Sequence, residues 1–511
     1  MLNAADEAGP GKLIGRASVV GAGAVYRQGV SFLSGLIIAR VIGASDFGIF
    51  NLARNLVEAT GIFTRLGLDI GLQRYFGETR STPYRDSRAV VLRRVRLLAN
   101  ALALLPVVAV ALGLGRVLEA NVYPYPSFAE VLLCLALALP FLTDIGVLGG
   151  AYRGILKLSP SVIAECVLLP TVRLAAIVVL FAAGWRLWAV VVGTTLASVL
   201  ASVFLARRAR IDFRDGAHAD PRAWSDVRRV MGYSSVLAVA VLVTTLTSSM
   251  DMLILGHFTT AHDLGQYSLV KTLLLLMGVF SAAFGQGLGA LVAERHFRGD
   301  LDGMVRVMSL NARLVTLATL PVFATFLFWG AQLTPLFGPS FATSQAVVGW
   351  LAVGQFVLFI FGPAGWALSM TGKHTLELKI LLTGLVIATL LCWVAVPALG
   401  QLGAALATCA SVAIMNVIRI LFVRRSIGAF PFGSDVLVIT AVGIGCAWAS
   451  DIVVAQFPLS QFWNAVFGVG CFVLAYGVVG WTHLLRESER RGIRSMVADT
   501  AGILTRGRGR A

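Results

Sequence analysis

The chain has 511 residues, of which 57% are hydrophobic and only 13% charged, whereas an average soluble domain has about 25% charged residues. A soluble fold cannot cover so much apolar surface, and six cysteines are too few for a disulfide scaffold of this length. The composition therefore excludes soluble and disordered proteins and indicates a polytopic membrane protein. In such a chain the net charge of +16 is typical of loops that face anionic lipid, not of a nucleic-acid-binding surface.

Fourteen apolar stretches are long enough to cross a membrane as helices. The hydrocarbon core is about 30 Å thick, and a helix needs about 20 residues to span it. The stretches lie near residues 17–39, 48–72, 97–115, 128–151, 161–183, 187–206, 232–255, 265–292, 310–330, 343–369, 376–397, 402–423, 435–455 and 463–485. These runs are too long for barrel strands. We therefore predict an all-α polytopic membrane protein with about fourteen transmembrane helices.

The basic residues outside the spans predict the orientation. The two termini and the even-numbered loops contain 32 Arg and Lys residues, whereas the odd-numbered loops contain only Arg40, Arg116 and Arg186. Positively charged loops remain in the cytoplasm, so both termini are expected there. Because the first apolar run has full length and Asp6 and Glu7 precede it, we expect an uncleaved membrane anchor instead of a signal peptide.

A short motif recurs 217 positions along the chain. Residues 44–48 read ASDFG and residues 261–265 read AHDLG, and Phe50 and Leu52 match Tyr267 and Leu269. An Asp before a helix can cap its N-terminus, so convergent capping is one explanation of the similarity. The matching aromatic and leucine positions favour a true repeat. Six helices separate the copies and give them the same orientation, which predicts two lobes related by an axis along the membrane normal.

The first copy of the motif resembles a known family. The run ARVIGASDFGIFNLA at 39–53, followed by RLGLDIGLQRYFGE at 65–78, is similar to the start of Wzx-type polysaccharide or O-antigen flippases of the multidrug/oligosaccharidyl-lipid/polysaccharide exporter superfamily. The resemblance implies a V-shaped, two-lobed bundle like that of MATE and MurJ proteins in a bacterial cytoplasmic (inner) membrane. It also implies alternating access that moves undecaprenyl-pyrophosphate-linked oligosaccharide repeat units to the periplasmic leaflet, for exopolysaccharide, capsule or O-antigen biosynthesis.

The chain is expected to divide into five parts. These are an N-lobe with helices 1–6 (1–206), a cytoplasmic linker with an amphipathic segment (207–231), a C-lobe with helices 7–12 (232–423), two extra helices (424–485) and a basic cytoplasmic tail (486–511). Within the linker, 221–229 is expected to form a short surface helix that leads into helix 7. The Arg-rich tail is expected to lie on anionic membrane lipids, with binding to a partner protein as the alternative.

Charged side chains inside the predicted spans are costly and are therefore candidates for function. Seven are basic: Arg27, Arg54, Arg65, Arg173, Lys271, Arg313 and Arg419. Snorkelling to the membrane surface explains the last two, which lie near cytoplasmic ends. On one continuous helix over 48–72, the charged residues Arg54, Glu58, Arg65 and Asp69 would share a face about 60° wide, which we expect to look inward. Two local ion pairs, Arg54 with Glu58 and Arg65 with Asp69, are the alternative explanation.

The repeat places Lys271 in helix 8 where Arg54 lies in helix 2, while Leu275 replaces Glu58. Two cations that face each other across a cleft suit a diphosphate, which carries two adjacent anionic groups. We therefore predict that Arg27, Arg54, Arg65 and Lys271 hold the pyrophosphate of the substrate and that the sugars occupy an aqueous cleft. Arg173 would add to the positive lining, or would pair with Glu165.

Four carboxylates in the spans are candidates for coupling transport to H⁺ or Na⁺: Glu58, Asp69, Asp144 and Asp251. A buried carboxylate can take up a proton or bind a cation, and ordinary salt bridging is the alternative role. No cofactor and no resident metal are predicted, because the six cysteines have no C-x-x-C spacing and neither the ATPase motif G-x-x-x-x-G-K-[ST] nor H-E-x-x-H occurs in the sequence.

Several function classes remain open at this point. A lipid-linked oligosaccharide flippase is preferred. A MurJ-type lipid II flippase shares the pyrophosphate, a MATE-type multidrug or cation antiporter would need an anionic cleft, and a glycan polymerase or ligase would need a large outside loop. We expect a monomeric transporter and not an enzyme. Its expected partners are lipid-linked oligosaccharide, anionic membrane lipids and a polysaccharide polymerase or glycosyltransferases, with no nucleic acid.

Overall fold

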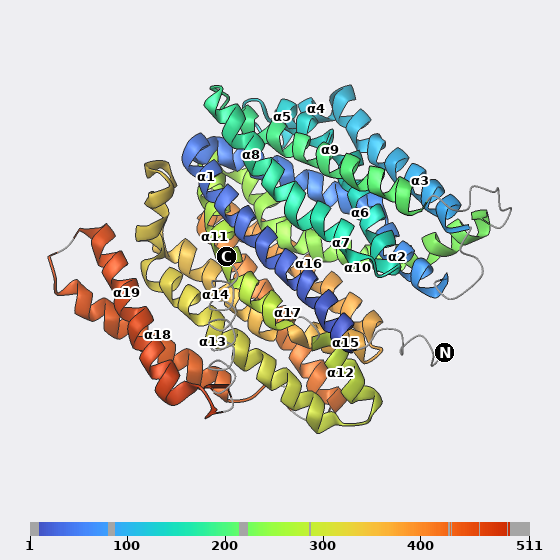
Figure 1. The fold of residues 1–511 in the computed structure, drawn as a ribbon. Helices are drawn as coiled ribbons and strands as arrows, with labels where there is room; N and C mark the ends of the chain where they lie inside the picture. Colours follow the sequence, from blue (N-terminus) through green and yellow to red (C-terminus); the bar gives the residue numbers. More distant parts are fainter. Residues whose placement is uncertain are drawn as a thin grey trace, which may run out of the picture.

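The computed structural model describes residues 10–79, 87–213, 223–285, 288–427, 430, 432–458, 460–487 and 489–490. Every regular element in these ranges is a helix (Figure 1). Within these described ranges, thirteen helical stretches are long and apolar enough to cross a membrane. The protein is therefore a multi-pass, all-α membrane protein, as the composition predicts.

The described residues of the N-terminal half form nine α-helices and two π-helical segments. They are α1 (Pro10–Arg65), α2 (Leu68–Glu78), α3 (Ser87–Ala109), η3 (Val110–Leu114), α4 (Gly115–Asn121), α5 (Phe128–Ala136), α6 (Leu139–Gly154), α7 (Leu158–Val162), η4 (Ile163–Leu168), α8 (Leu169–Ala182) and α9 (Leu187–Asp212).

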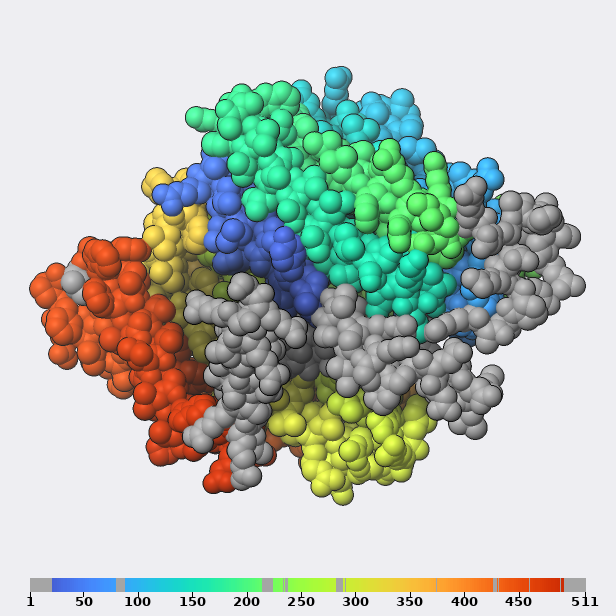
Figure 2. Space-filling model, in the orientation of Figure 1, coloured from blue at the N-terminus to red at the C-terminus, as the bar shows by residue number. Residues whose placement is uncertain are grey.

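The C-terminal half is built in the same way and adds two helices at its end. Its elements are α10 (Ala223–Phe258), α11 (Ala261–Gly285), α12 (Leu288–Phe297), α13 (Leu301–Leu333), η5 (Thr334–Phe337), η6 (Pro339–Phe341), α14 (Gln345–Phe361), α15 (Pro363–Met370), α16 (His374–Leu399), α17 (Gln401–Ile427), α18 (Asp435–Ala455), α19 (Gln461–Val479) and η7 (Gly480–Leu484). In Figures 1 and 2 the added pair, drawn in red, lies at one edge of the molecule.

The first of the thirteen stretches covers two of the fourteen predicted spans. It runs from Gly21 to Glu78 over 58 residues, and Gly43 interrupts it with φ 80° and ψ 174°. This non-helical conformation divides α1 into two helical segments, which are helices 1 and 2 of the sequence prediction. The fourteen predicted spans and the thirteen observed stretches therefore agree.

Helix boundaries show that the repeat extends far beyond the short motif. Helix α5 begins at Phe128 and α14 at Gln345, while α8 ends at Ala182 and α16 at Leu399. Each pair is separated by the same 217 positions as Gly48 and Gly265. The two lobes thus share one helical plan, as predicted for a parallel repeat.

The lobes meet along α1, α10 and α11. At the end predicted to face outside, Gly48 of α1 and Gly265 of α11 pack backbone to backbone. The Tyr125 hydroxyl adds a hydrogen bond of 2.8 Å to the Thr259 carbonyl oxygen across the same end. In Figure 2 the dark-blue part of α1 is seen between the green and yellow regions of this face.

The segment 221–229, predicted as a short surface helix that leads into helix 7, is helical in the part that the structure describes, but it is not a separate helix and it is partly buried. Residues from Ala223 onward are the first turns of α10. Val227 and Val230 are buried in an apolar cluster with Leu72 and Phe76 of α2, so burial against the N-lobe makes this segment continuous with the membrane helix. The predicted linker residues 214–222 and the tail from 491 lie outside the described residues.

Candidate functional site at the lobe interface

Arg54 and Glu58 form a pair on the second segment of α1. The guanidinium Nε donates to Glu58 Oε1 over 2.7 Å, and the two side chains are 39% and 49% exposed. The alternative of a local i,i+4 ion pair is therefore realised at this position. The exposure nevertheless leaves both groups accessible at the depth of a membrane helix, where polar groups are expected to line a water-filled space.

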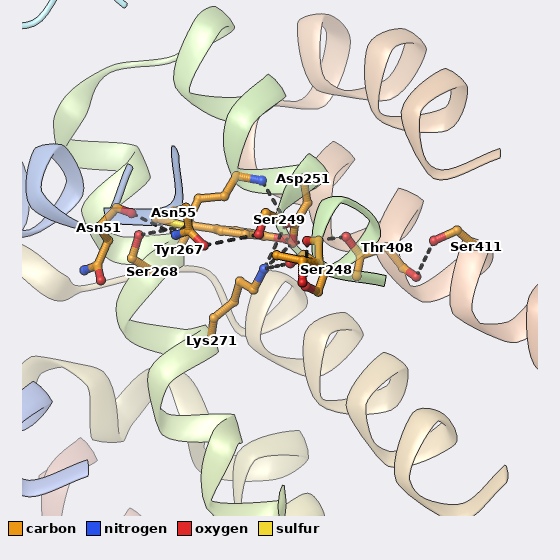
Figure 3. Close-up of polar contacts among 12 residues, drawn as sticks. Asn51, Asn55, Ser248, Ser249, Asp251, Tyr267, Ser268, Lys271, Thr408 and Ser411 are labelled. Atoms are coloured by element: carbon orange, nitrogen blue, oxygen red, sulfur yellow. Dashed lines mark hydrogen bonds and ion pairs between the residues drawn. The ribbon is translucent and has the colours of Figure 1, made fainter. Parts of the chain in front are cut away.

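The equivalent cation of the C-lobe has a different partner (Figure 3). Lys271 Nζ lies 2.9 Å from both carboxylate oxygens of Asp251 and donates to the Ser248 carbonyl oxygen. The carboxylate also accepts hydrogen bonds from Tyr267 at 2.7 Å and Thr408 at 3.3 Å. Asp251 is 3% exposed and Lys271 22%. Residues from α10, α11 and α17 thus hold the lysine, so it is not the unpaired cation that the sequence suggests.

An asparagine of α1 connects this cluster to the N-lobe. Asn55 lies next to Arg54, and its amide donates to the Met252 sulfur over 3.2 Å, while its oxygen accepts from Ser249 over 3.3 Å. Both partners belong to α10. Figure 3 shows Asn55 and Lys271 approaching the same stretch of α10. These contacts place Arg54 beside the interface between the lobes.

A second basic cluster surrounds Glu165 of η4. Arg153 of α6 donates to Glu165 Oε1 over 3.1 Å, and Arg27 and Arg65 are near enough to act on the same carboxylate electrostatically. Arg65 also donates to the Gly61 carbonyl oxygen over 3.1 Å. Because Arg54 and Arg65 are eleven residues apart on one helix, this cluster lies about 16 Å along α1 from the first. The alternative in which Arg173 pairs with Glu165 does not occur among the described residues, since Arg153 takes that place.

Arg173 of α8 belongs instead to the level of Arg54. It interacts electrostatically with Arg54 and Glu58, and its buried Nε has no hydrogen-bond partner among the described residues. Such a donor is costly to leave unsatisfied. Among the described residues, this donor thus lacks the acceptor that its burial calls for.

The predicted single face of four charges is wrong beyond Arg65. The backbone takes left-handed angles at Leu66 (φ 47°) and Gly67 (φ 65°), and α2 starts after them. The alternative pairing of Arg65 with Asp69 fails for the same reason, because the two residues no longer lie on one helix. No ion pair of Asp69 occurs in the described part of the chain.

Asp144 lies away from the lobe interface. Its carboxylate is 4% exposed and pairs with Arg96 of α3. Gly146, two residues later on α6, faces Arg65, and two residues correspond to a rotation of about 200° around a helix. Asp144 therefore points to the opposite side of α6, away from the lobe interface, and its role as a coupling-ion candidate stays a prediction.

The two cations explained by snorkelling are instead buried in ion pairs. Arg313 binds Asp435 at 2.6 Å and Glu489 at 3.1 Å, which fastens α18 and the start of the tail to α13. Arg419 pairs with Glu377 of α16. Both arginines are less than 10% exposed, so tertiary partners satisfy them and not the membrane surface.

The two clusters, one at Arg54 and Lys271 and the other around Glu165, together carry more positive than negative charge. The cations are Arg27, Arg54, Arg65, Arg153, Arg173 and Lys271, and the carboxylates are Glu58, Glu165 and Asp251. Arg153, Asn55, Tyr267 and Thr408 are members that sequence reasoning missed. Arg153 was counted with the loop charges, and Tyr267 was noted only as the repeat match of Phe50. Asn55 and Thr408 carry no distinguishing sequence signal.

The sequence profile of the family described as "Polysaccharide biosynthesis protein" matches residues 16–288, which is more than half of the chain. The chain belongs to this family. A comparison with curated protein sequences finds no match.

Solved structures show which fold the family member adopts. A lipid II flippase MurJ in an inward closed conformation is similar with a TM-score of 0.68 and 11% identity, over 90% of this chain and 98% of that one. An inward-facing multidrug resistance MATE family transporter is similar with a TM-score of 0.66 and 14% identity, over 79% and 95%. The fold is therefore that of the MOP superfamily transporters.

A third solved structure shares this fold with a lower score. An outward-facing MATE family transporter gives a TM-score of only 0.54 at 14% identity, over 81% of this chain and 96% of that one. In this protein the Gly48–Gly265 contact closes the end of the lobe interface that is predicted to face outside.

Proposed function

We propose that this protein is a flippase that moves undecaprenyl-pyrophosphate-linked oligosaccharide repeat units across a bacterial inner membrane, for surface polysaccharide biosynthesis. The observation that carries the proposal is the excess of cations over carboxylates at the lobe interface, on a flippase-type fold in a polysaccharide biosynthesis family member. A pyrophosphate needs such a surface. The lipid tail stays in the bilayer, because transfer of each CH₂ into water costs about 0.8 kcal/mol.

The two basic clusters suggest two stations for the headgroup. Arg27, Arg65 and Arg153 form the station nearer the cytoplasmic end, and Arg54, Arg173 and Lys271 form the station nearer the Gly48–Gly265 contact. At each station a carboxylate, Glu165 or Glu58, already interacts with the cations. The pyrophosphate therefore competes with this carboxylate and does not enter a site of unopposed positive charge. Such competition favours release, which a transporter needs as much as binding.

Coupling to H⁺ or Na⁺ belongs to the proposal as well. Glu58 and Asp251 are the carboxylates that the structure brings to the lobe interface, and protonation of either would release its cation toward the phosphate. We propose a monomer with both termini in the cytoplasm. A polysaccharide polymerase or glycosyltransferases would supply or consume the lipid-linked glycan.

The test is flipping of a lipid-linked oligosaccharide in proteoliposomes, scored by accessibility of the sugar to an impermeant lectin. Arg54→Gln and Lys271→Glu are expected to lower the rate about tenfold or more, because one charge-assisted phosphate contact is lost. Arg74→Gln is the matched control. Arg74 forms an i,i+4 pair with Glu78 at the same 2.7 Å and with similar exposure, but it lies on α2. Normal flipping by Lys271→Glu would contradict the proposal.

The alternatives predict different substrates in the same assay. A MurJ-type protein would flip lipid II with its pentapeptide in preference to the oligosaccharide. A MATE-type antiporter would exchange organic cations, which the cation excess at the interface disfavours. Deletion of the gene should therefore cause lipid-linked oligosaccharide to accumulate on the cytoplasmic leaflet without a change in drug sensitivity.

A further inference from the structure

A pocket lined by both polar and apolar side chains lies in the N-lobe, away from the lobe interface. Residues of α3, α6 and α9 line a cavity of about 380 Å³. Helices α3 and α9 both pack on α6, whose Pro140, Phe141 and Asp144 line the pocket between them. Because Asp144 lies on the side of α6 opposite Gly146 and Arg65, this pocket is separated from the proposed substrate path by the helix itself.

The pocket is lined by the buried carboxylate of Asp144 and by the arginines of α9. Asp144 accepts from Arg96 Nη2 at 2.8 Å and from Ser202 at 2.8 Å, so the charge of Arg96 is already neutralised. Arg207 and Arg210 of α9 also line the pocket and have no ion pair among the described residues. The lining therefore keeps two positive charges that no carboxylate of the pocket balances.

Two further features of the lining indicate which kind of molecule fits this pocket. The side-chain oxygen of Asn100 in the pocket is buried and has no hydrogen-bond partner in the described part of the protein, so it can accept from a hydroxyl or ammonium donor. Leu104 and Val203 line the same pocket and are 51% and 38% exposed. The occupant thus combines an anionic group, a donor and an apolar chain.

We propose that this pocket binds an anionic glycerophospholipid of the surrounding bilayer. The phosphate lies between Arg207 and Arg210, a headgroup hydroxyl donates to Asn100, and an acyl chain follows Leu104 and Val203. The position agrees with this assignment, because Arg210 is close to the end of α9 and Arg96 lies within the first three turns of α3. These arginines are therefore at headgroup depth, where basic pockets between helices bind anionic lipids.

The experiment measures lipid binding to the purified full-length protein by native mass spectrometry, with phosphatidylglycerol and phosphatidylcholine as probes. Arg207→Gln/Arg210→Gln is expected to weaken phosphatidylglycerol binding about tenfold. The control Arg208→Gln/Arg228→Gln removes the same charge from exposed positions outside the pocket and is expected to bind within about twofold of the parent. Equal losses in both double variants, or equal binding of both lipids, would overturn the proposal.

Two further arms keep the test decisive. Ala206→Phe retains both arginines but fills the pocket from α9, so it should displace phosphatidylglycerol even if the charge variants unfold. Continued lipid binding by folded Ala206→Phe would refute the pocket as the site. Inorganic phosphate at about 10 mM should leave the lipid bound, since it lacks the acyl chain. Full displacement by phosphate would show a free-anion site instead of a lipid site.

Discussion

Gly48 and Gly265 are equivalent residues of the two lobes, and each packs against the backbone that surrounds the other. A methyl group on Gly48 would lie 2.7 Å from the Gly265 nitrogen, and one on Gly265 would overlap the Ala44 carbonyl group. The contact is reciprocal, as at a two-fold axis where residue i meets j and j meets i. The repeated Asp-x-Gly motif therefore closes one end of the interface, because only glycine allows the two helices to approach so closely.

A side chain at either glycine is expected to weaken this closed end. Gly265→Ala should destabilise this closed end by about 1–3 kcal/mol through overpacking. The ratio of closed to open protein should then fall about 5- to 150-fold. Spin labels at Ser45→Cys and His262→Cys, which are equivalent exposed positions beside the contact, should then report a longer distance in a background without the native cysteines. The matched control is Gly29→Ala, where a methyl group meets no atom within 4 Å. Unchanged distance distributions in Gly265→Ala would show that the Gly48–Gly265 contact does not hold this end closed.

Local features of the fold were predictable because they depend on short sequence patterns. Long apolar runs identified the spans, and the 217-residue offset identified both the lobes and the equivalence of Arg54 with Lys271. The i,i+4 alternative for Arg54 and Glu58 is confirmed, since the helix alone brings them together. These inferences need no knowledge of how distant segments pack.

Tertiary packing decided the features that the sequence did not reveal. The break at Gly67 has a positive φ, and a side chain there would press on the Ser234 carbonyl of α10, a contact between segments far apart in sequence. The partner of Lys271 comes from α10, and the partner of Asp144 comes from α3. A sequence with single charges on separate helices does not say which of them meet.

The Lys271–Asp251 pair should show strong thermodynamic coupling. Asp251→Asn removes the negative charge that balances the Lys271 ammonium. It is expected to cost about 2–3 kcal/mol, a value below that of a fully buried pair because Lys271 is partly exposed. Lys271→Met leaves a buried carboxylate and should cost a similar amount. The double variant should lose less than the sum of the singles by at least about 1 kcal/mol, measured by reversible unfolding in mixed micelles. Additive losses would show that the two groups act independently.

Asp300 is expected to make one helix start sensitive to acid. It caps α13 by accepting the Gly303 N–H at 2.8 Å, and the same carboxyl binds Arg295 at 2.7 Å. These hydrogen bonds lower the pKa of Asp300 below its ordinary value. A lowered pKa in the folded state gives stability that is present above the unfolded value of about 3.9 and is lost as pH falls through the folded value. In an NMR titration the Asp300 carboxyl should titrate at lower pH than in the Arg295→Gln variant; identical titration curves would exclude the arginine as a cause.

Removal of the carboxylate that competes for Arg54 should tighten binding but slow transport. Glu58 holds the guanidinium by a half-exposed ion pair, and such pairs contribute only about 0–1 kcal/mol to stability, so Glu58→Gln should fold normally. The released arginine is then free for a phosphate, and the affinity for a short-chain isoprenyl pyrophosphate should rise about three- to tenfold by calorimetry. Flipping at saturating substrate should fall, since release from the Arg54 station becomes slower. Glu78→Gln breaks a pair of the same geometry on α2 and should change neither quantity. An equal effect of the two variants, or lower affinity in Glu58→Gln, would show that Glu58 does not compete with the substrate for Arg54.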